Sequence, residues 1–361
     1  MKQNRREFVK NTGLLLGSSL FPYGLFAAPN AKKLNVCLVG LGNYSSVILA
    51  PALQMTKHCQ LTGIVTGTPS KIPKWQKKYN IPDKNVYNYD TMRLIANNPD
   101  IDVIYIVVPT GLHAKYAIEA ANTGKHVWCE KPMAKTEAEC KSIIDACTKN
   151  KVKLSIGYRM QHEPNTQTVI KWANSKPYGK IKSLRAELGY NVGKPAKTWR
   201  LDSDLGGGAM YDLGVYPLNA ARYTTGEEPI SVIAQQMTTR PEIFTETDET
   251  THFTLEFPSG VIAHCKTSLG KSMHELYVNC ENGWYTLAPF SMYTGVKGKA
   301  SDGKLLNQYI ESQQAKQMDD DALAIINNTP VIVPGEDGIK DIRIVEAIYK
   351  SAKSGTKVNL L

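Results

Sequence analysis

Short apolar runs alternate with helix-like segments through the first 157 residues. The pattern predicts strands at residues 34–39, 60–65, 103–108, 126–129 and 153–157. Helix-like stretches lie between them, for example at 47–55 and 114–123. Alternation of strands and helices is typical of a parallel sheet with helices on both faces. The sequence therefore predicts a doubly wound, nucleotide-binding type of α/β domain at the start of the chain.

The alternation ends after this point, and longer strand-like segments follow a helix predicted at 165–174. Strands are predicted at 230–238, 251–257, 261–267 and 275–280. Pro258-Ser259-Gly260 and Glu281-Asn282-Gly283 have the composition of tight turns, so neighbouring strands should form hairpins. This pattern predicts a large, mainly antiparallel open β-sheet with a helix beside it. Burial of the open face would favour a homodimer or homotetramer.

A chain of 361 residues suits two domains of ordinary size. We assign residues 31–155 to the doubly wound domain and residues 156–361 to the antiparallel-sheet domain, which would bind the substrate and form the oligomer. The fold class is thus α/β plus α+β.

Residues 1–30 read as an export signal rather than as part of the fold. Arg5-Arg6 with Phe8, an apolar stretch over 13–21 and Ala27-Ala28 resemble a twin-arginine signal. The apolar stretch is short for a membrane span and is followed by Pro22. We therefore expect a periplasmic protein, anchored to the membrane only if the signal is not cleaved.

The net charge of +10 does not indicate a nucleic-acid partner, because lysines are scattered among acidic residues without a run of five basic residues. The seven cysteines show no closely spaced pair of the kind that binds metals, such as two cysteines two positions apart. Cys37 and Cys129 fall in apolar strands, where buried thiols are expected. If the protein is exported, a disulfide between some of these cysteines remains an alternative. The histidines have no metal-ligand spacing, so we predict no metal.

A glycine-rich turn, Gly40-Leu41-Gly42, joins the first strand to the next helix-like segment. Gly40 permits a tight turn, Gly42 lets the backbone approach a pyrophosphate, and Ser45 replaces the usual third glycine. An NAD site usually has an acidic residue after the second strand, whereas this chain has Thr66, Gly67, Ser70 and Lys71. A hydroxyl with a lysine suits a 2′-phosphate, so NADP is favoured over NAD.

Two further clusters carry candidate chemistry. Lys131, in Glu130-Lys131-Pro132, follows the fourth strand, at the edge where open α/β sheets bind ligands. Asp212 and Tyr216 follow a triple glycine and share a face if that segment is helical. A carboxylate and a phenol on one face can orient a substrate hydroxyl and exchange its proton.

Taken together with Gly157-Tyr158-Arg159, these motifs resemble the Gfo/Idh/MocA oxidoreductase family over nearly everything after the signal. The resemblance implies a Rossmann domain, an antiparallel-sheet domain and a lysine beside the nicotinamide, here Lys131. Most members have a histidine four residues after the aspartate, where this chain has Tyr216. That departure, with Trp199-Arg200-Leu201 and Gly226-Glu227-Glu228-Pro229, resembles the glucose–fructose oxidoreductase branch, whose members are exported by the twin-arginine route and hold NADP tightly.

The expected activity is hydride transfer between a sugar and the nicotinamide. Tyr216 is the expected general acid/base, Lys131 stabilises its phenolate, and Asp212 orients the sugar hydroxyl and Lys131. The expected cofactor-binding residues are Gly40, Gly42, Asn43, Tyr44, Thr66, Gly67, Ser70, Lys71, Pro109, Thr110, His113, Glu130 and Lys131. The expected substrate-binding residues are Tyr158, Arg159, Trp199, Arg200, Asp212 and Tyr216. His113 is expected to support the start of a helix rather than to act in catalysis.

Two alternatives use the same residues. One is a glycosidase that oxidises its substrate transiently with a bound nicotinamide and then eliminates the leaving group. The shorter chain and the missing acid after the second strand favour the oxidoreductase. The other is a non-catalytic sugar- or nicotinamide-binding protein, because a fold does not fix a function. The joint presence of Lys131, Asp212 and Tyr216 argues against it.

Overall fold

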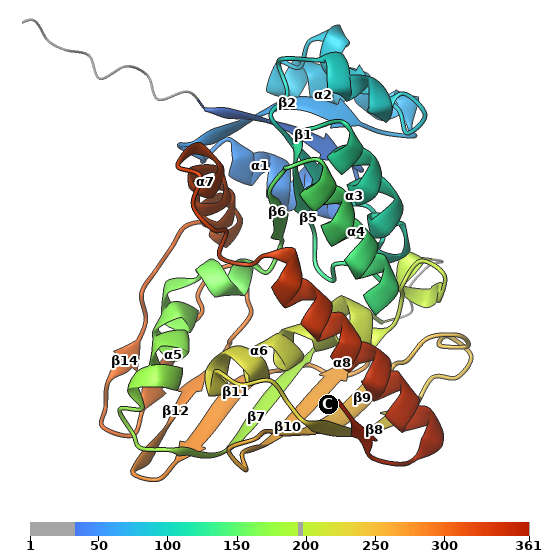
Figure 1. Ribbon diagram of the computed structural model, residues 1–361. Coiled ribbons are helices and arrows are strands. Elements are labelled where there is room, and N and C mark those ends of the chain that lie inside the picture. Colours follow the sequence, from blue (N-terminus) through green and yellow to red (C-terminus); the bar gives the residue numbers. More distant parts are fainter. Residues whose placement is uncertain (1–32, 194–197, 361) are drawn as a thin grey trace, which may run out of the picture. The chain divides into compact units, whose positions relative to one another are not determined.

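The computed structural model describes residues 33–193 and 198–360, which form two β-sheets with helices packed on them (Figure 1). The export signal expected at residues 1–30 lies outside the described residues. Residues 33–361 group as one compact unit.

The first sheet has six strands, and every pairing in it is parallel. In order across the sheet, the strands are β3 (Val86–Tyr87), β2 (Cys59–Val65), β1 (Leu34–Val39), β4 (Val103–Ile106), β5 (His126–Cys129) and β6 (Leu154–Ile156). This is the order of dinucleotide-binding sheets, with the chain reversing direction across the sheet between β1 and β4. The predicted parallel sheet is confirmed.

Helices cover both faces of this sheet, and one of them comes from the far end of the chain. The helices α3 (His113–Asn122) and α4 (Glu137–Lys149) pack on one face, whereas α1 (Ala50–Leu53), α2 (Ile72–Tyr79) and α7 (Gln313–Ile326) contribute to the core on the other. Figure 1 shows α7 beside α1. Met318 of α7 is fully buried in the same core as Trp128 of β5. The range expected for the second domain therefore includes a helix that completes the first.

The second sheet has nine strands, one face of which is covered by α5 (Pro164–Ser175), α6 (Val215–Thr225) and α8 (Gly335–Ser354) (Figure 1). In order across the sheet, the strands are β14 (Leu305–Leu306), β13 (Gly298–Ala300), β12 (Gly283–Leu287), β11 (Met273–Cys280), β7 (Ile181–Gly189), β10 (Ile262–Ser268), β9 (Thr250–Glu256), β8 (Ser231–Met237) and β15 (Val358–Asn359). The two predicted hairpins, β9–β10 and β11–β12, are both present and antiparallel.

The central strand β7 pairs in parallel with β10, which makes the sheet mixed. This strand was not predicted from the sequence. Its outward positions hold Arg185 and Glu187, and its partner β10 lies more than seventy residues further along the chain, so no turn composition marks the pairing. The predicted large, mainly antiparallel sheet is nevertheless confirmed.

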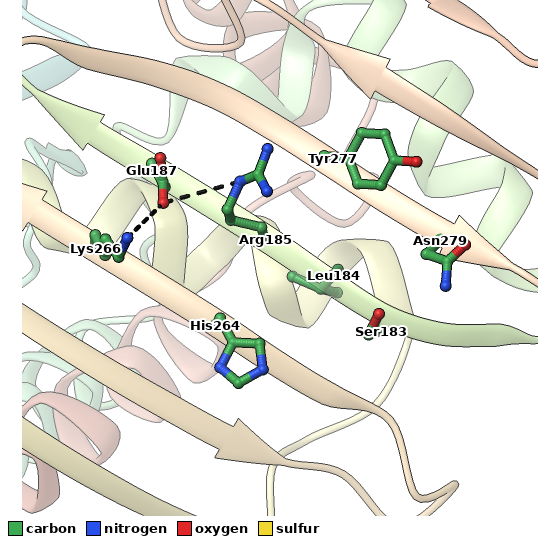
Figure 2. Close-up of a pocket in the computed structure, with 8 residues that line it drawn as sticks. All are labelled: Ser183, Leu184, Arg185, Glu187, His264, Lys266, Tyr277 and Asn279. Carbon is green, nitrogen blue, oxygen red and sulfur yellow. Dashed lines mark ion pairs between the residues drawn. The ribbon is translucent and has the colours of Figure 1, made fainter.

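The other face of the second sheet carries polar and charged side chains. A hollow of about 500 Å³ lies on this face. Among the residues that line it, Lys266 and Arg185 flank Glu187 (Figure 2). Arg185 also pairs with Glu275 and lies over the ring of Tyr277. No helix of the described segments packs on this face in Figure 1, so in the single chain it faces solvent.

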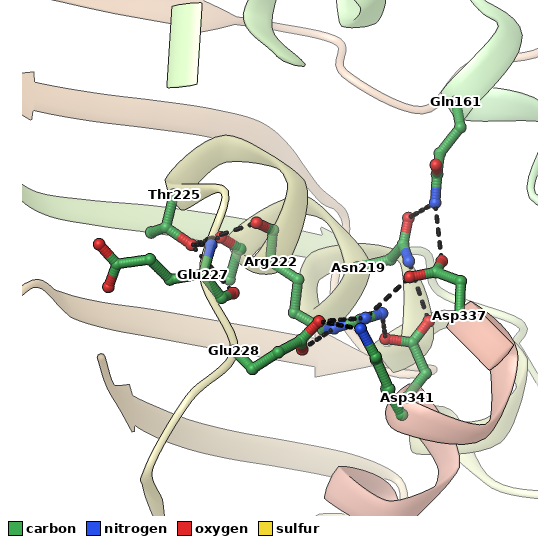
Figure 3. Close-up of polar contacts among 10 residues, drawn as sticks. Gln161, Asn219, Arg222, Thr225, Glu227, Glu228, Asp337 and Asp341 are labelled. Atoms are coloured by element: carbon green, nitrogen blue, oxygen red, sulfur yellow. Dashed lines mark hydrogen bonds and ion pairs between the residues drawn. The ribbon is translucent and has the colours of Figure 1, made fainter. Parts of the chain in front are cut away.

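A buried ionic cluster joins α6 to α8 (Figure 3). Arg222 of α6 donates to Asp341 at 2.7 Å and Asp337 at 2.8 Å, both on α8, and to Glu228 at 2.7 Å. Its side chain is 5% exposed and that of Asp341 is fully buried. Burial raises the pKa of Asp341 to about 6, although Arg222 opposes the shift. The charges in this cluster therefore depend on one another.

All seven cysteines are buried free thiols, as expected for the two in apolar strands. Within residues 33–193 and 198–360, no helix is long and apolar enough to cross a membrane. The same residues contain no group of three or more His, Cys, Asp or Glu side chains placed to hold a metal ion.

Candidate active site

The turns after four strands of the first sheet meet at one edge. Val39 of β1 pairs with Val65 of β2 and with Ile106 of β4, and Ile106 pairs with Cys129 of β5. The segments that follow these strands hold the residues expected to bind the cofactor. They begin at Gly40, Thr66, Val107 and Glu130. Parallel pairing in this register therefore brings together residues that are up to ninety positions apart.

The glycine turn fits a dinucleotide. Gly40 has φ of +93°, and a Cβ there would come within 2.8 Å of the carbonyl oxygen of Val107, so only glycine suits the position. A Cβ at Gly42 would meet no protein atom within 4 Å, so protein packing does not require glycine there. The open space agrees with close approach of a ligand to the backbone. Ser45 is buried and donates to the carbonyl of Gly40 at 2.5 Å, which closes the turn.

Lys71 connects the end of β2 to this turn. Its ammonium donates to the carbonyl of Leu41 at 2.7 Å, although thirty residues separate the two. Thr66 is buried and accepts a hydrogen bond from the backbone of Thr68, whereas Ser70 is exposed. The side of the turn where an acidic residue would bind a ribose therefore presents a cation.

Glu130 is a buried carboxylate directly before Lys131. It accepts a hydrogen bond from the hydroxyl of Tyr105 at 2.6 Å, and burial raises its pKa. A Cβ at Gly157 would come within 2.8 Å of Glu130, which explains the glycine of Gly157-Tyr158-Arg159. The carboxylate of Glu130 also accepts a hydrogen bond from the backbone amide of Lys131 at 3.3 Å, which helps to fix the backbone there.

His113 contacts the backbone of the segments that follow β4 and β5. Its two ring nitrogens lie 2.8 Å from the carbonyl oxygens of Pro132 and Val108. The ring is 1% exposed, and burial lowers its pKa. This placement agrees with a supporting role at the start of α3.

Lys131 connects the two expected catalytic residues of the second domain. Its ammonium donates to the main-chain carbonyl of Asp212 at 2.7 Å and lies 4.6 Å from the ring centroid of Tyr216. The bond uses the backbone of Asp212 rather than its carboxylate. Asp212 lies in a π-helical stretch, Met210–Gly214, that continues into α6, on which Tyr216 stands. One lysine from the first domain therefore meets both residues.

The carboxylate of Asp212 is held by two residues of the second domain. Its Oδ2 accepts hydrogen bonds from Arg200 Nε at 2.6 Å and from the hydroxyl of Tyr190 at 3.2 Å. Oδ1 takes no hydrogen bond from the described part of the chain, which leaves it for a substrate hydroxyl. Tyr190, directly after β7, was not singled out from the sequence. The sequence around it contains no motif, and the strand before it was not predicted, so nothing indicated that Tyr190 lies beside Asp212.

The triple glycine is required by close packing around Asp212. A Cβ at Gly208 would lie 2.1 Å from Asp248, and one at Gly206 would lie 2.8 Å from Thr110. Asp248 is buried and accepts from the backbone of Met210 at 2.9 Å, which anchors the start of the helical stretch. Sequence reasoning missed Asp248 because it lies in a different segment, between β8 and β9.

The other expected substrate-binding residues occupy different environments. Tyr158 and Arg159 are buried, at 1% and 3% exposure, and protein groups surround them. Trp199 and Arg200 are half-buried, and the guanidinium carbon of Arg200 lies 4.8 Å from the ring centroid of Trp199. Direct contact of these four residues with a sugar stays a prediction, which the geometry favours for Trp199 and Arg200 only.

We expect Tyr190→Phe to lower kcat/KM for the substrate about fivefold, because one hydrogen bond that orients the Asp212 carboxylate is lost while that of Arg200 remains. Steady-state kinetics at saturating cofactor measure the effect. Cofactor affinity should not change. A kcat/KM within twofold of wild type would show that Tyr190 does not orient Asp212.

Two family models match this chain. Residues 34–158 match the oxidoreductase family with an NAD-binding Rossmann fold, and residues 166–286 match the GFO/IDH/MocA C-terminal domain. The crystal structure of an aldose-aldose oxidoreductase from Caulobacter crescentus complexed with glycerol superposes with a TM-score of 0.87 and is 37% identical, over 91% of this chain and 100% of that one.

The chain belongs to the Gfo/Idh/MocA oxidoreductase family. Two named enzymes are similar to it at 25% identity. They are the D-xylose 1-dehydrogenase [NADP(+)] of Haloarcula marismortui, over 90% of this chain and 92% of that protein, and the D-glucoside 3-dehydrogenase of Escherichia coli, over 92% and 99%. Membership makes this protein an enzyme that uses a nicotinamide dinucleotide bound by its first domain, as the sequence predicted.

Proposed function

We propose that this protein transfers a hydride between a sugar or sugar derivative and NADP, and that the cofactor stays bound while two sugars react in turn. The observation that supports this most directly is the position of Lys131. Its ammonium lies at the cofactor-binding edge of the first sheet and also contacts Asp212 and Tyr216 of the second domain. Relatives named for aldose or xylose oxidation support the substrate class.

Each residue has a defined task in this reaction. A bound nicotinamide dinucleotide would supply the hydride acceptor or donor. In the oxidation, Tyr216 takes the proton of the sugar hydroxyl while the adjacent C–H bond breaks and its hydride leaves. Asp212 Oδ1 accepts a hydrogen bond from a sugar hydroxyl and fixes the ring. The ammonium of Lys131 lies 4.6 Å from the centroid of the Tyr216 ring and so places a cation beside the residue that takes the proton.

Lys71 supports NADP rather than NAD, because its ammonium already lies at the glycine turn. We expect Lys71→Ala to weaken binding of NADP about tenfold while leaving NAD unchanged, since a charge-assisted bond to the 2′-phosphate is lost. Titration of tryptophan fluorescence with each nucleotide measures this. Lys74→Ala, an exposed lysine of α2, is the matched control. Equal weakening of NADP and NAD would instead show that Lys71 only shapes the turn.

Export and assembly are part of the same proposal. The resemblance of residues 1–30 to a twin-arginine signal supports a periplasmic enzyme that folds around its cofactor before export. The charged open face of the second sheet, with Arg185, Glu187 and Lys266, supports a homodimer or homotetramer formed through that face. Sedimentation of the purified protein, with Tyr277→Glu as a disrupting variant, would test the assembly.

The proposed reaction is tested by incubating the enzyme and NADP with a panel of aldoses and following NADPH. Reduction of the enzyme-bound NADP by at least one aldose, reversed when a second sugar is added, supports the proposal. An aryl glycoside given without added nucleotide distinguishes the alternative chemistry, because sustained release of the aryl group would identify a glycosidase. Absence of both activities over a broad panel of sugars would contradict the proposal.

A further inference from the structure

The segment that joins β12 to β13, residues 288–297, reaches from the second sheet to the glycine turn of the first domain. The ring of Tyr293 lies 6.1 Å from the ring of Tyr44, centroid to centroid, with 35° between the planes. Tyr44 stands at the start of the helix that follows the glycine turn. Its hydroxyl accepts a hydrogen bond from Gln314 of α7 at 3.4 Å. Two elements from the C-terminal half of the chain therefore meet at Tyr44.

The base of this segment is fixed by buried groups. Phe290 is fully buried, and its ring packs edge-on against His274 with the centroids 5.7 Å apart. Arg159 donates to the carbonyls of Ser291 and Met292, the latter at 3.2 Å. The side-chain amide of Gln313 donates to the carbonyl of Met292 at 2.8 Å. The backbone up to Met292 is therefore held in one position.

The tip of the segment is exposed although it is apolar. Met292 and Tyr293 are 47% and 45% exposed. Covering a bound ligand would remove the apolar surface of both side chains from water, which is favourable. Because their backbone is already fixed beside the turn shaped for a pyrophosphate, little conformational freedom would be lost on binding. The geometry favours a dinucleotide over a sugar as that ligand, because the ring that Tyr293 contacts belongs to the glycine turn.

Arg159 links this tip to the expected acid/base. Its guanidinium carbon lies 4.6 Å from the ring centroid of Tyr293 and 5.2 Å from that of Tyr216. Its Nε is buried without a hydrogen-bond partner in the described residues. The Nη atoms hold the guanidinium through the two carbonyls and through Oε1 of Gln313, and the two rings flank it. Arg159 thus acts as a positioning residue for the covering segment.

We propose that Tyr293, positioned by Arg159, closes the dinucleotide site from the side of the second domain and slows the release of NADP. The inference rests on the proposed function, because it explains how the cofactor is retained between two sugars. It assigns Arg159 a role in cofactor retention in place of the sugar contact expected from the sequence. Release would require separation of Tyr293 from Tyr44.

The test is the rate at which bound NADPH leaves the full-length enzyme, followed in a stopped-flow chase by loss of energy transfer from tryptophan when excess NADP is added. We expect Tyr293→Ala to raise this rate about tenfold, since an aromatic contact across the site is lost, and Tyr293→Phe to retain the wild-type rate because the ring remains. Tyr309→Ala, which truncates an exposed tyrosine between β14 and α7, should leave the rate unchanged.

Arg159→Lys keeps the charge but cannot hold two carbonyls with one planar group. It should raise the release rate, and adding Tyr293→Ala should raise it less than the product of the two single effects. Multiplication of the two effects, or a release rate in Tyr293→Ala within twofold of wild type, would overturn the inference while the proposed function stands. Failure of the wild-type enzyme to bind NADPH would instead refute the proposed function itself.

Discussion

Replacing Tyr216 with phenylalanine is expected to lower kcat by about 10²–10⁴-fold, the usual contribution of a positioned general acid/base. The substitution removes only the phenol oxygen. The ring stays, so Lys131 keeps the aromatic surface 4.6 Å from its ammonium, and α6 keeps its packing. KM for the sugar and affinity for NADP should therefore change little. Initial rates with the best donor and acceptor sugars, at saturating concentrations of both, measure the effect.

Tyr223→Phe is the control for this prediction, because Tyr223 lies on the same helix and loses the same atom. It should keep near-wild-type turnover. A solvent isotope effect on kcat that disappears in Tyr216→Phe would further tie the residue to proton transfer. Turnover of Tyr216→Phe within threefold of wild type would remove Tyr216 from the chemistry and leave Lys131 as the candidate.

Replacing Arg222 with methionine is expected to lower the free energy of unfolding by about 3–5 kcal/mol, as happens when one partner of a buried ion pair is removed. Asp341 is fully buried and lies 2.7 Å from the Arg222 guanidinium, so the substitution would leave its carboxylate buried without a cation. The cluster also connects to the turn that carries Arg159: Gln161, in the same turn, donates to Asn219 of α6 and to Asp337 of α8 (Figure 3). Urea denaturation at pH 7 measures the loss.

Lys340→Met provides the comparison, because Lys340 pairs with the same Glu228 but both side chains are 47% exposed. An exposed pair contributes about 0–1 kcal/mol, so this variant should unfold almost like wild type. If Arg222→Met does not fold, Arg222→Lys keeps the charge and should show an intermediate loss, since its single nitrogen cannot reproduce the separate Nε, Nη1 and Nη2 bonds to the three carboxylates. A loss below about 1 kcal/mol in Arg222→Met would show that the cluster adds little to stability.

Much of the first domain could be predicted because its signals are local. The strand β1, the glycines of the turn and Ser45 are close in sequence, and periodicity with composition identifies them. The hairpins of the second sheet were equally accessible, since Pro258-Ser259-Gly260 marks one of them directly. The family resemblance then joined Lys131 to Asp212 and Tyr216, which no local pattern could do.

The contacts that arise from long-range pairing could not be predicted. The parallel pairing of β7 with β10 leaves no turn signature, so Tyr190 directly after β7 was not expected beside Asp212. In the same way, nothing in the sequence around Tyr293 indicates that it meets Tyr44. Arg159 was expected to bind a sugar hydroxyl, which stays a prediction, but its burial and its bonds to backbone carbonyls could not be predicted from the sequence.

The central claim is that one bound NADP serves two sugars on this enzyme. The direct measurement is the absorbance of reduced nicotinamide in protein passed through gel filtration, without added nucleotide. The account predicts that bound nucleotide survives the column, that its absorbance rises when an electron-donating aldose is added, and that it falls again when an acceptor sugar follows. A bound nucleotide whose absorbance does not respond to any aldose, ketose or sugar lactone would contradict the account.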